Sequence, residues 1–383
     1  MRSAIVLVLL VLLLTVSAAV QADVEPLEPE TISVESLGAH TPHWMVLNDS
    51  NFLGYMDSKA YLVDVDSGRT LGMLSTGGYR GAMEIAPDFS LLYSLETYYP
   101  RVTRGDRTDV ITVYDTKNLA AVDEIIIPPK RATGAMMRGY SGMSDDGRFM
   151  FVANMTPAMS VTVVDLVNRS VIAETPTSGC MIVLPTGPRS FAMLCGDGTL
   201  MHLKLDDQGQ IVSKEKTPPF FSAADDPVTE RAARAGNTWY LISFYGQIHP
   251  VNFASGDLVV AESFSALSES ELAADWRTGG AHYVAAHAGL NRYFVVVNQD
   301  GEDSHKNPGD RIYAYDLNSQ ERVLEIVLPG KVTQLGISND AKPVLVAGGE
   351  DPPIYVIDPT TGELIKTLEG PILGAGMMQF PSQ

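Results

Sequence analysis

The sequence predicts an all-β protein, a seven-bladed β-propeller with a short helical insertion, and three observations support this fold class. Turn-forming residues are plentiful, with 33 Gly and 23 Pro, while charged residues make up only 19% of the 383 residues. This composition favours strands and turns over charged helices. The other two observations are repeats, each counted seven times along the chain and interleaved with one another.

The first repeat is a short apolar segment that ends in Asp or Asn and runs into a turn rich in Asp, Asn, Ser, Thr or Gly. Its last residues are Asp64, Asp115, Asp165, Asp206, Asn252, Asp316 and Asp358. Successive intervals are 51, 50, 41, 46, 64 and 42 residues. Alternating apolar residues followed by such a turn are typical of two antiparallel strands joined tightly.

The second repeat is a polar turn followed by an apolar strand. It occurs at residues 48–56, 86–96, 144–154, 185–195, 234–243, 287–297 and 338–348. Several strands in each period of 40 to 50 residues are what propeller blades require. A β-sandwich has similar turn spacing but would not repeat both features seven times. We expect ring closure between an N-terminal strand, near Thr31 to Leu37, and the C-terminal blade, because an open ring exposes strand edges.

The long interval between Asn252 and Asp316 predicts an insertion. Ser268 is followed three residues later by Glu271. This spacing is a capping box, in which each residue bonds the backbone N–H of the other, and it opens a short helix.

Residues 1–22 form a predicted signal peptide, cleaved after Ala22. Arg2 supplies the positive start, Ala4 to Val16 is apolar, and small residues precede the cleavage site. A membrane anchor is the alternative, but the apolar run is short for a spanning helix, which needs about 20 apolar residues. We therefore expect one propeller domain over residues 23–383 of an exported protein with no membrane anchor after cleavage.

The formal charge of −19 excludes several classes of partner. A phosphate backbone would be repelled, so nucleic acid is not an expected ligand, and anionic lipid is disfavoured for the same reason. An acidic surface can instead steer cationic partners or small cationic substrates.

The two cysteines, Cys180 and Cys195, stand in the segment CMIVLPTGPRSFAMLC. In an exported protein an even count favours a disulfide, and two strands joined by PTGPRS would bring the thiols together. A pair of free buried thiols is the alternative. A metal site is a poor hypothesis, because two sulfurs with only His202 nearby do not give a four-ligand pattern.

The segment from Trp276 to Lys306 contains His282, His287 and His305. Neither a strand nor a helix aligns His282 with His287 as a metal pair. We expect His287 to hold the turn that it begins, and His305 to lie in a solvated loop. The acidic residues 300–303 lack the full set of oxygen ligands that calcium takes. There is also no G-x-S-x-G nucleophile and no phosphate-binding loop, so no catalytic or metal-binding residue is predicted on this chain.

The segment ETYYPRVTRGDRTD places an arginine-rich stretch in an acidic chain. Its notable residues are Tyr98, Tyr99, Arg101, Arg104 and Arg107. A solvated loop is the plain interpretation. A partner-docking loop is the other, because Tyr and Arg anchor interfaces more often than most residues.

Three long segments carry a family resemblance. RVTRGDRTDVITVYD (101–115), GCMIVLPTGPRSFAMLCGDGTL (179–200) and ELAADWRTGGAHYVAAHAGLNRYFVVVNQDGEDSHK (271–306) resemble the heavy subunit of tryptophan tryptophylquinone amine dehydrogenases, the methylamine and aromatic amine dehydrogenase family. The resemblance runs over nearly the whole mature chain. It departs from the family at 75–88, which lacks a proline-rich turn, and in its short N-terminus.

The resemblance implies a heavy subunit that pairs with a small light subunit in an α2β2 assembly in the periplasm. The quinone, tryptophan tryptophylquinone, would form from two tryptophans of the light subunit. The reaction would oxidise a primary amine to an aldehyde and ammonia and pass electrons to a blue-copper protein or a cytochrome. At the residue level the resemblance implies that Phe52 shapes the substrate channel; a core or rim aromatic is the alternative for this residue. It also implies that Trp276 to Lys306 faces the light subunit or supports the channel, so Trp276 joins the docking candidates.

Two rival hypotheses remain open at this point. One is a stand-alone secreted propeller that serves only as a binding or assembly module. The other is a self-contained propeller hydrolase or lactonase with a central metal, whose carboxylate and histidine ligands cannot be assembled convincingly from the predicted blade starts.

Overall fold

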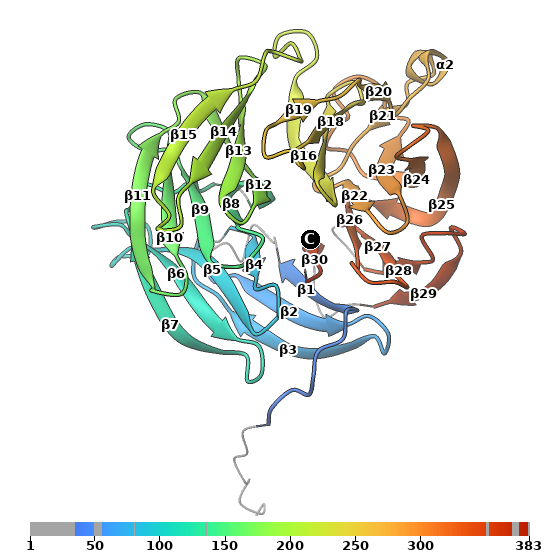
Figure 1. The fold of residues 1–383 in the computed structure, drawn as a ribbon. Helices are drawn as coiled ribbons and strands as arrows, with labels where there is room; N and C mark the ends of the chain where they lie inside the picture. Colours follow the sequence, from blue (N-terminus) through green and yellow to red (C-terminus); the bar gives the residue numbers. More distant parts are fainter. Residues whose placement is uncertain are drawn as a thin grey trace, which may run out of the picture. The chain divides into compact units, whose positions relative to one another are not determined.

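The computed structural model describes residues 35–49, 56–79, 81–134, 136–349, 352–369 and 375–381. The predicted signal peptide lies outside these residues. Nearly all of them belong to one compact unit, Ser36–Gln383, and the description concerns this unit. Its strands form seven sheets arranged around a central axis (Figure 1), so the predicted seven-bladed β-propeller is confirmed. In the part of the chain described, no helix is long and apolar enough to cross a membrane.

The strands of each blade follow, from the axis outward. The first blade contains β30 (Ala375–Gln379), β1 (Trp44–Asp49), β2 (Lys59–Asp64) and β3 (Arg69–Ser75). The second contains β4 (Met83–Ile85), β5 (Leu91–Tyr98), β6 (Thr108–Asp115) and β7 (Ala120–Ile127). The third contains β8 (Ser141–Met143), preceded by the 3-10 turn η2 (Arg138–Tyr140), then β9 (Phe149–Asn154), β10 (Ser160–Asp165) and β11 (Ser170–Pro176). The fourth contains β12 (Cys180–Gly187), β13 (Ser190–Cys195), β14 (Leu200–Leu205) and β15 (Ile211–Lys216).

The fifth and sixth blades carry extra strands. The fifth contains β16 (Val228–Ala235), β17 (Thr238–Ser243), β18 (Gln247–Asn252) and β19 (Val259–Val260), with β20 (Phe264–Ser265) also on β18. The sixth contains β21 (Arg277–Thr278) and β22 (Val284–His287), both paired with β23 (Arg292–Asn298), then β24 (Gly309–Asp316) and β25 (Arg322–Val332). The seventh contains β26 (Gln334–Ile337), β27 (Leu345–Gly348), β28 (Ile354–Ile357) and β29 (Leu364–Leu368).

Ring closure differs from the expectation. The C-terminal strand β30 joins the first blade as its innermost strand, with Leu47 opposite Met378 in an antiparallel pair. The N-terminal segment does not extend the last blade: the Leu37 N–H donates to the Lys117 carbonyl in the second blade, at 2.8 Å. Residues 31–34 of the expected closing strand lie outside the described part. Either arrangement ties the two ends of the ring together and covers the edges of its terminal blades.

The first sequence repeat marks the turn between the third and fourth strand of every blade. In each case the side-chain oxygen of the Asp or Asn accepts a hydrogen bond from the backbone N–H two residues later, at 2.7–3.1 Å. Such a bond turns the chain without help from neighbouring strands. The repeat therefore reflects one local requirement met seven times.

The second repeat marks the turn between the first and second strands in six blades. Strands β5, β9, β13, β17, β23 and β27 all begin within the predicted turn-strand segments. The prediction at 48–56 is wrong for the first blade, because its second strand is β1 (Trp44–Asp49), which ends as that segment begins. Residues 50–55 lie outside the described part.

The antiparallel strands divide the turns between two faces of the ring. The turns that follow Asp64, Asp115 and their five equivalents share one face with the turns between first and second strands; we call it the Asx-turn face. The connections between second and third strands and those between blades lie on the other, the connection face. Loop 99–107, between β5 and β6, is on the connection face.

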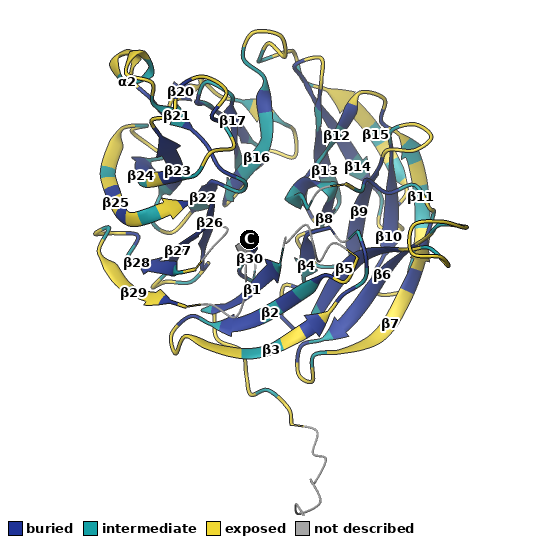
Figure 2. Cartoon of the chain, turned by 180° about the vertical axis from the view of Figure 1, so that it is seen from behind, coloured by how far each residue is buried: buried dark blue, intermediate teal, exposed yellow. Residues whose placement is uncertain are grey.

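Burial follows the radial order of the strands. The second and third strands of the blades are mostly buried, while the outermost strands are largely exposed or half-buried (Figure 2). Apolar side chains of neighbouring blades pack against each other between sheets, as where Phe151 of β9 stacks on Phe191 of β13 with ring centroids 4.1 Å apart. Close packing of this kind fixes the blades as one rigid scaffold.

Candidate functional site

The arginine-rich loop is a tight, exposed turn on the connection face. The Arg101 N–H donates to the Arg104 carbonyl at 3.0 Å, and Val102 between them has φ 62° and is 66% exposed. Arg101 and Arg104 are also exposed. Both side chains can therefore meet another molecule.

Arg107 has a different environment. Its guanidinium donates to both carboxylate oxygens of Asp109, at 2.7 and 2.8 Å, and to the Arg131 carbonyl at 2.7 Å. Asp109 is fully buried and also accepts from Thr97 at 2.7 Å. Arg131 is buried and donates through Nε to Thr97 at 2.9 Å. Arg107 is thus part of an internal polar network that supports the loop, and this network accounts for it without a partner protein.

The two tyrosines of the same segment are held differently. The Tyr98 hydroxyl donates to buried Glu96, yet the side chain is 44% exposed. Burial and the neighbouring Glu96 raise the pKa of Tyr98. Tyr99 meets Tyr79 edge-on, with ring centroids 6.0 Å apart. Both rings are therefore fixed at the base of the loop by contacts within the chain.

The predicted helical insertion is confirmed as α2 (Glu269–Ala273), and its capping box pairs Ser268 with Glu271. Trp276 follows the helix and is half-buried, with the Arg311 guanidinium 4.8 Å from its ring centroid. The remaining candidate, Phe52, lies outside the described residues, in the connection between β1 and β2.

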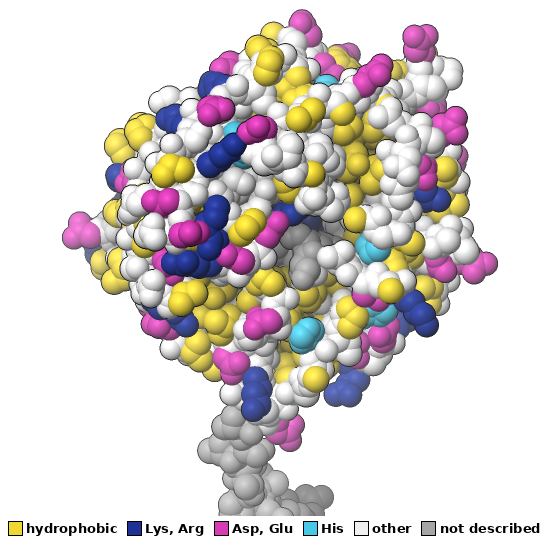
Figure 3. All heavy atoms as spheres, in the orientation of Figure 1, with side chains coloured by type: hydrophobic (Ala, Val, Ile, Leu, Met, Phe, Trp, Pro, Cys, Tyr) yellow, Lys and Arg dark blue, Asp and Glu magenta, His cyan; other side chains and the backbone are white. Residues whose placement is uncertain are grey.

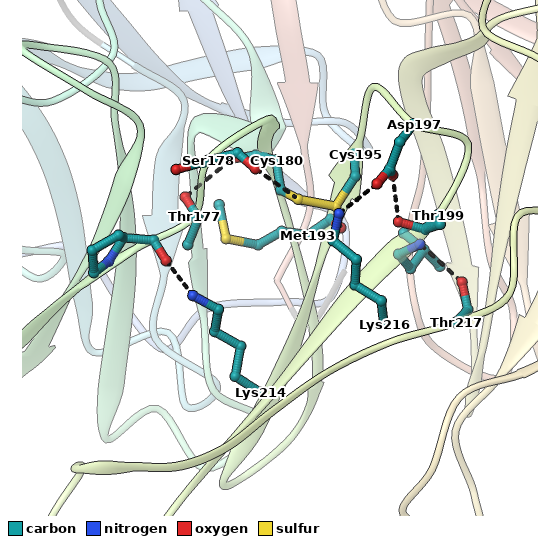
Figure 4. Close-up of a disulfide and its surroundings, with 12 residues drawn as sticks. Thr177, Ser178, Cys180, Met193, Cys195, Asp197, Thr199, Lys214, Lys216 and Thr217 are labelled. Atoms are coloured by element: carbon teal, nitrogen blue, oxygen red, sulfur yellow. Dashed lines mark hydrogen bonds and ion pairs between the residues drawn. A yellow bond between two sulfur atoms is a disulfide. The ribbon is translucent and has the colours of Figure 1, made fainter.

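The predicted disulfide between Cys180 and Cys195 is present (Figure 4). The two residues are opposite each other where β12 begins and β13 ends. Both cysteines are buried. The ion pair between Lys216 and Asp197, with Nζ and Oδ2 2.5 Å apart, lies beside the disulfide. The bond closes the inner hairpin of the fourth blade.

An axial cavity of about 490 Å³ is lined by residues from all seven blades. The space-filling view is hollowed near its centre (Figure 3). Lining residues Pro87, Ser144, Gly236 and Ala288 belong to turns between first and second strands, so the cavity reaches the Asx-turn face. Its walls are mostly apolar, with a few polar groups that converge, which is the usual composition of a small-molecule site.

Glu84 of β4 and Arg138 of η2 are the main charged groups inside the cavity. The Ser141 hydroxyl donates to Glu84 Oε1 at 2.5 Å. Burial raises the pKa of Glu84 to about 7, against the opposing effects of Ser141 and Arg138. Burial also lowers the pKa of Arg138 to about 10, so its guanidinium remains cationic at neutral pH. Arg138 reaches across to the first blade and donates to the Met378 carbonyl at 2.5 Å.

His282 lines the same cavity, a position that the sequence did not predict. Burial, with Arg138 and Arg231 as smaller causes, lowers its pKa well below the usual range, so the ring is neutral. Arg231 is paired with Glu230 and donates to the Ala281 carbonyl at 2.8 Å. The signal that could have found these groups is a charged residue inside an otherwise apolar innermost strand, as in AMEIAPD around Glu84.

The other two histidines of the segment are structural. His287 accepts at Nδ1 from the Leu290 N–H at 3.0 Å, so it holds its own turn as predicted. His305 was expected in a solvated loop, but its ring is half-buried 4.9 Å from that of Phe244, and burial lowers its pKa. The loop folds back onto the fifth blade, which local composition could not indicate.

No self-contained redox or metal centre is assembled from the described residues. They hold no group of three or more His, Cys, Asp or Glu side chains that could bind a metal. All three tryptophans are described, and Trp44, Trp239 and Trp276 lie in separate parts of the ring, on β1, on β17 and before β21. No two of them could be cross-linked into a quinone. The fold and sites define a class: seven-bladed propellers with an exposed arginine-rich loop on one face and a largely apolar axial cavity, with a few charged groups, open to the other.

Comparison with known proteins identifies the family within this class. The model of the methylamine dehydrogenase heavy chain (MADH) family matches residues 44–376, and the chain belongs to this family. It is 26% identical to the methylamine dehydrogenase heavy chain of Methylophilus methylotrophus over 346 residues, which are 90% of this chain and 84% of that one. The heavy chains of Methylorubrum extorquens and Paracoccus versutus are also 26% identical, over 83% and 82% of this chain and 78% and 73% of their own lengths.

Two solved structures share the fold. One is dihydro-heme d1 dehydrogenase NirN in complex with DHE, with a TM-score of 0.55 and 19% identity, covering 89% of this chain and 66% of that one. The other is a functionally unknown protein from Desulfotomaculum acetoxidans, with a TM-score of 0.60 and 10% identity over 88% of this chain and 98% of that one. At these identities the likeness is one of architecture alone.

Proposed function

We propose that this chain is the large, non-cofactor subunit of a periplasmic quinoprotein amine dehydrogenase. The complex would oxidise a primary amine to an aldehyde and ammonia and pass the electrons to a cupredoxin or a cytochrome. Membership of the methylamine dehydrogenase heavy chain family is the observation that carries the proposal. The separation of the three tryptophans supports it, because a tryptophylquinone would then have to reside on another chain.

In this proposal the chain binds and orients a light subunit that carries tryptophan tryptophylquinone, in an α2β2 assembly. When bound, that group supplies the two-electron oxidation of the amine. This chain contributes a rigid docking face and excludes water from the amine channel, with Phe52 at its mouth. Arg101, Arg104, Tyr98, Tyr99 and Trp276 are the docking residues, while Arg107 shapes the loop from beneath.

The test is a pull-down of the tagged full-length chain from the periplasm of its own host. We expect a small chain to co-purify, to stain as a quinone and to reduce an artificial electron acceptor when a primary amine is added. Amine oxidation by the chain alone would contradict the proposal. If the chain is recovered repeatedly with no small partner and without quinone stain, the stand-alone binding module is the better description.

Arg104→Ala provides a sharper version of this experiment. We expect it to reduce recovery of the small chain, because Arg104 is exposed at the tip of the docking loop. Arg69→Ala is the matched control: Arg69 is an equally exposed arginine at a turn on the Asx-turn face. Equal losses in both variants, or no loss in either, would remove this loop from the interface.

A further inference from the structure

The axial cavity has no role in the function proposed above. It reaches the Asx-turn face, whereas the docking loop lies on the connection face. Its volume of about 490 Å³ is within the range of about 300 to 1,000 Å³ that small-molecule sites occupy. What the cavity could hold follows from the charges that line it.

Most of the charges around the cavity are already paired. The titratable lining groups are Glu84, Arg138, Asp145, Glu230, Arg231, Arg234, His282 and His287. Arg234 donates to both oxygens of Asp145, at 2.6 and 2.8 Å, and Arg231 pairs with Glu230. Burial lowers the pKa of both histidines, which are therefore neutral at pH 7. The lining residues of β12, of the seventh blade and of β30 include no titratable group.

Two charged groups remain, Glu84 and Arg138, and neither forms an ion pair among the described residues. Arg138 has five N–H donors. Within the described part of the chain its one acceptor is the Met378 carbonyl, and its Nε is buried without a partner. A buried donor that lacks an acceptor costs about 1–3 kcal/mol, and a ligand acceptor on the Arg138 guanidinium would offset part of this cost.

We propose that the axial cavity binds a small organic monocarboxylate, with its carboxylate on the Arg138 guanidinium and its apolar body against the walls. Protonated Glu84, held by Ser141, faces the anion and can donate to it. Met83, Ile182, Val284, Ile337 and Phe380 supply the apolar lining. Arginine suits this role because its planar donors match a carboxylate.

The charged residues that line the cavity also indicate which class of ligand fits. A primary ammonium would enter the field of a guanidinium that has no anion in contact with it, and the carboxylates Glu230 and Asp145 are already occupied. A dicarboxylate would need a second unpaired cation, which the described lining does not offer. An inorganic anion would leave the apolar walls without contacts.

The arrangement couples binding to proton uptake. An ionised Glu84 would repel the bound carboxylate, so the site favours the ligand when Glu84 is protonated. With the pKa of Glu84 at about 7 in the free protein, affinity should fall about tenfold between pH 6 and pH 8. Burial lowers the pKa of His282 well below the usual 6.5, so its ring stays neutral in this window, and burial also lowers the pKa of His287, which is neutral at pH 7 and above.

The experiment is calorimetric titration of phenylacetate into the purified full chain, together with any subunit that co-purifies. Phenylacetamide and 2-phenylethylammonium serve as neutral and cationic probes of the same shape. We expect phenylacetate to bind most tightly, about tenfold better at pH 6 than at pH 8, and to take up protons at pH 7. Equal binding of the amide, tighter binding of the ammonium, or no heat at millimolar phenylacetate would overturn the proposal.

Two variants assign the effect to the named residues. Glu84→Gln keeps the acceptor for Ser141 and should bind phenylacetate with the same affinity at pH 6 and pH 8. A tenfold pH effect that persists in this variant would refute the role of Glu84. Arg138→Met should lose binding. If Arg138→Met does not fold, the pH dependence of phenylacetate binding in Glu84→Gln tests the proposal instead. If Arg138→Met folds and binds phenylacetate like the unmodified chain, the proposal fails. None of these outcomes depends on whether the chain takes part in amine oxidation.

Discussion

Two arginines seven residues apart, Arg131 and Arg138, lie in the connection from the second to the third blade, and their surroundings differ. Arg131 is buried and donates to Thr97, to Ala132 and to Tyr79, while its own N–H bonds Asp109. Arg138 lines the axial cavity with one described acceptor, the Met378 carbonyl. A buried arginine whose donors are bonded to several internal acceptors stabilises the fold. A buried arginine with one internal acceptor, on the wall of a cavity, has donors left to bind a ligand.

The largest expected loss of stability comes from a change in the polar network of Arg107, Asp109 and Arg131. Asp109→Asn would remove the carboxylate that binds the Arg107 guanidinium and the Arg131 backbone N–H. Removing one partner of a buried charge network costs about 3–5 kcal/mol. Urea unfolding should show this loss in the free energy of unfolding. Asp123→Asn is the control, because the exposed Asp123–Arg169 pair, at 3.2 Å, should contribute at most about 1 kcal/mol. Similar small losses in both variants would contradict the assignment.

Matched replacements of the two arginines test the comparison directly. Arg131→Met should cost about 3 kcal/mol, because several buried oxygens lose their donor. Arg138→Met should change the free energy of unfolding by less than about 1 kcal/mol, since it also removes a desolvated charge with few partners. Thermal or urea unfolding measures both. If Arg138→Met were the more damaging change, Arg138 would be a structural tie between the third and first blades.

The sequence predicts the blades and their turns better than it predicts the axial cavity. Blade number, turn positions, the capping box and the disulfide are local patterns, and each has a local cause, such as the bond from Asp64 to the N–H two residues on. The cavity is assembled by ring closure from residues as distant as Glu84 and Gln379. Local periodicity cannot show which innermost side chains meet on the axis.

The polar network was hidden for a related reason. Arg101, Arg104 and Arg107 look alike in the sequence, yet only Arg107 finds an internal carboxylate, that of Asp109 two residues on. The Arg131 carbonyl, 24 residues from Arg107 in the connection to the third blade, completes the site, and local spacing cannot show this contact. The C-terminal closure was missed because β30 is short and its partner, β1, is more than 300 residues earlier in the chain.

An intermediate effect on the free energy of unfolding is expected from the titration of Glu84. Its folded pKa of about 7 exceeds the unfolded value of 4.5, so the folded state binds the proton more tightly. Stability from this group is complete below pH 4.5 and is lost as the pH rises toward 7 and above. Glu84→Gln should therefore match the unmodified chain near pH 5 and exceed it at pH 8. We expect a gain of about 2 kcal/mol, reduced from the full linkage value because the carboxyl faces a solvent-accessible cavity.

Unfolding at several pH values measures this difference. The ligand must be absent, because a bound carboxylate would itself stabilise the folded chain. A gain at pH 8 that equals the gain at pH 5 would mean that Glu84 does not titrate in this range, and the predicted pH dependence of carboxylate binding would lose its cause.

The smallest effect on stability is expected at the exposed tip of the arginine-rich loop. Arg104→Ala should shift the free energy of unfolding by no more than about 0.5 kcal/mol, because the side chain is exposed and its one described side-chain bond is to the neighbouring Thr103 carbonyl. Arg107→Ala, three residues on, should cost about 1.5–3 kcal/mol through lost charge-assisted bonds to Asp109. Urea unfolding compares the two variants. If the order is reversed, the loop tip is held by contacts other than those described, and a loss of partner recovery in Arg104→Ala would then report a disturbed loop instead of a lost interface contact.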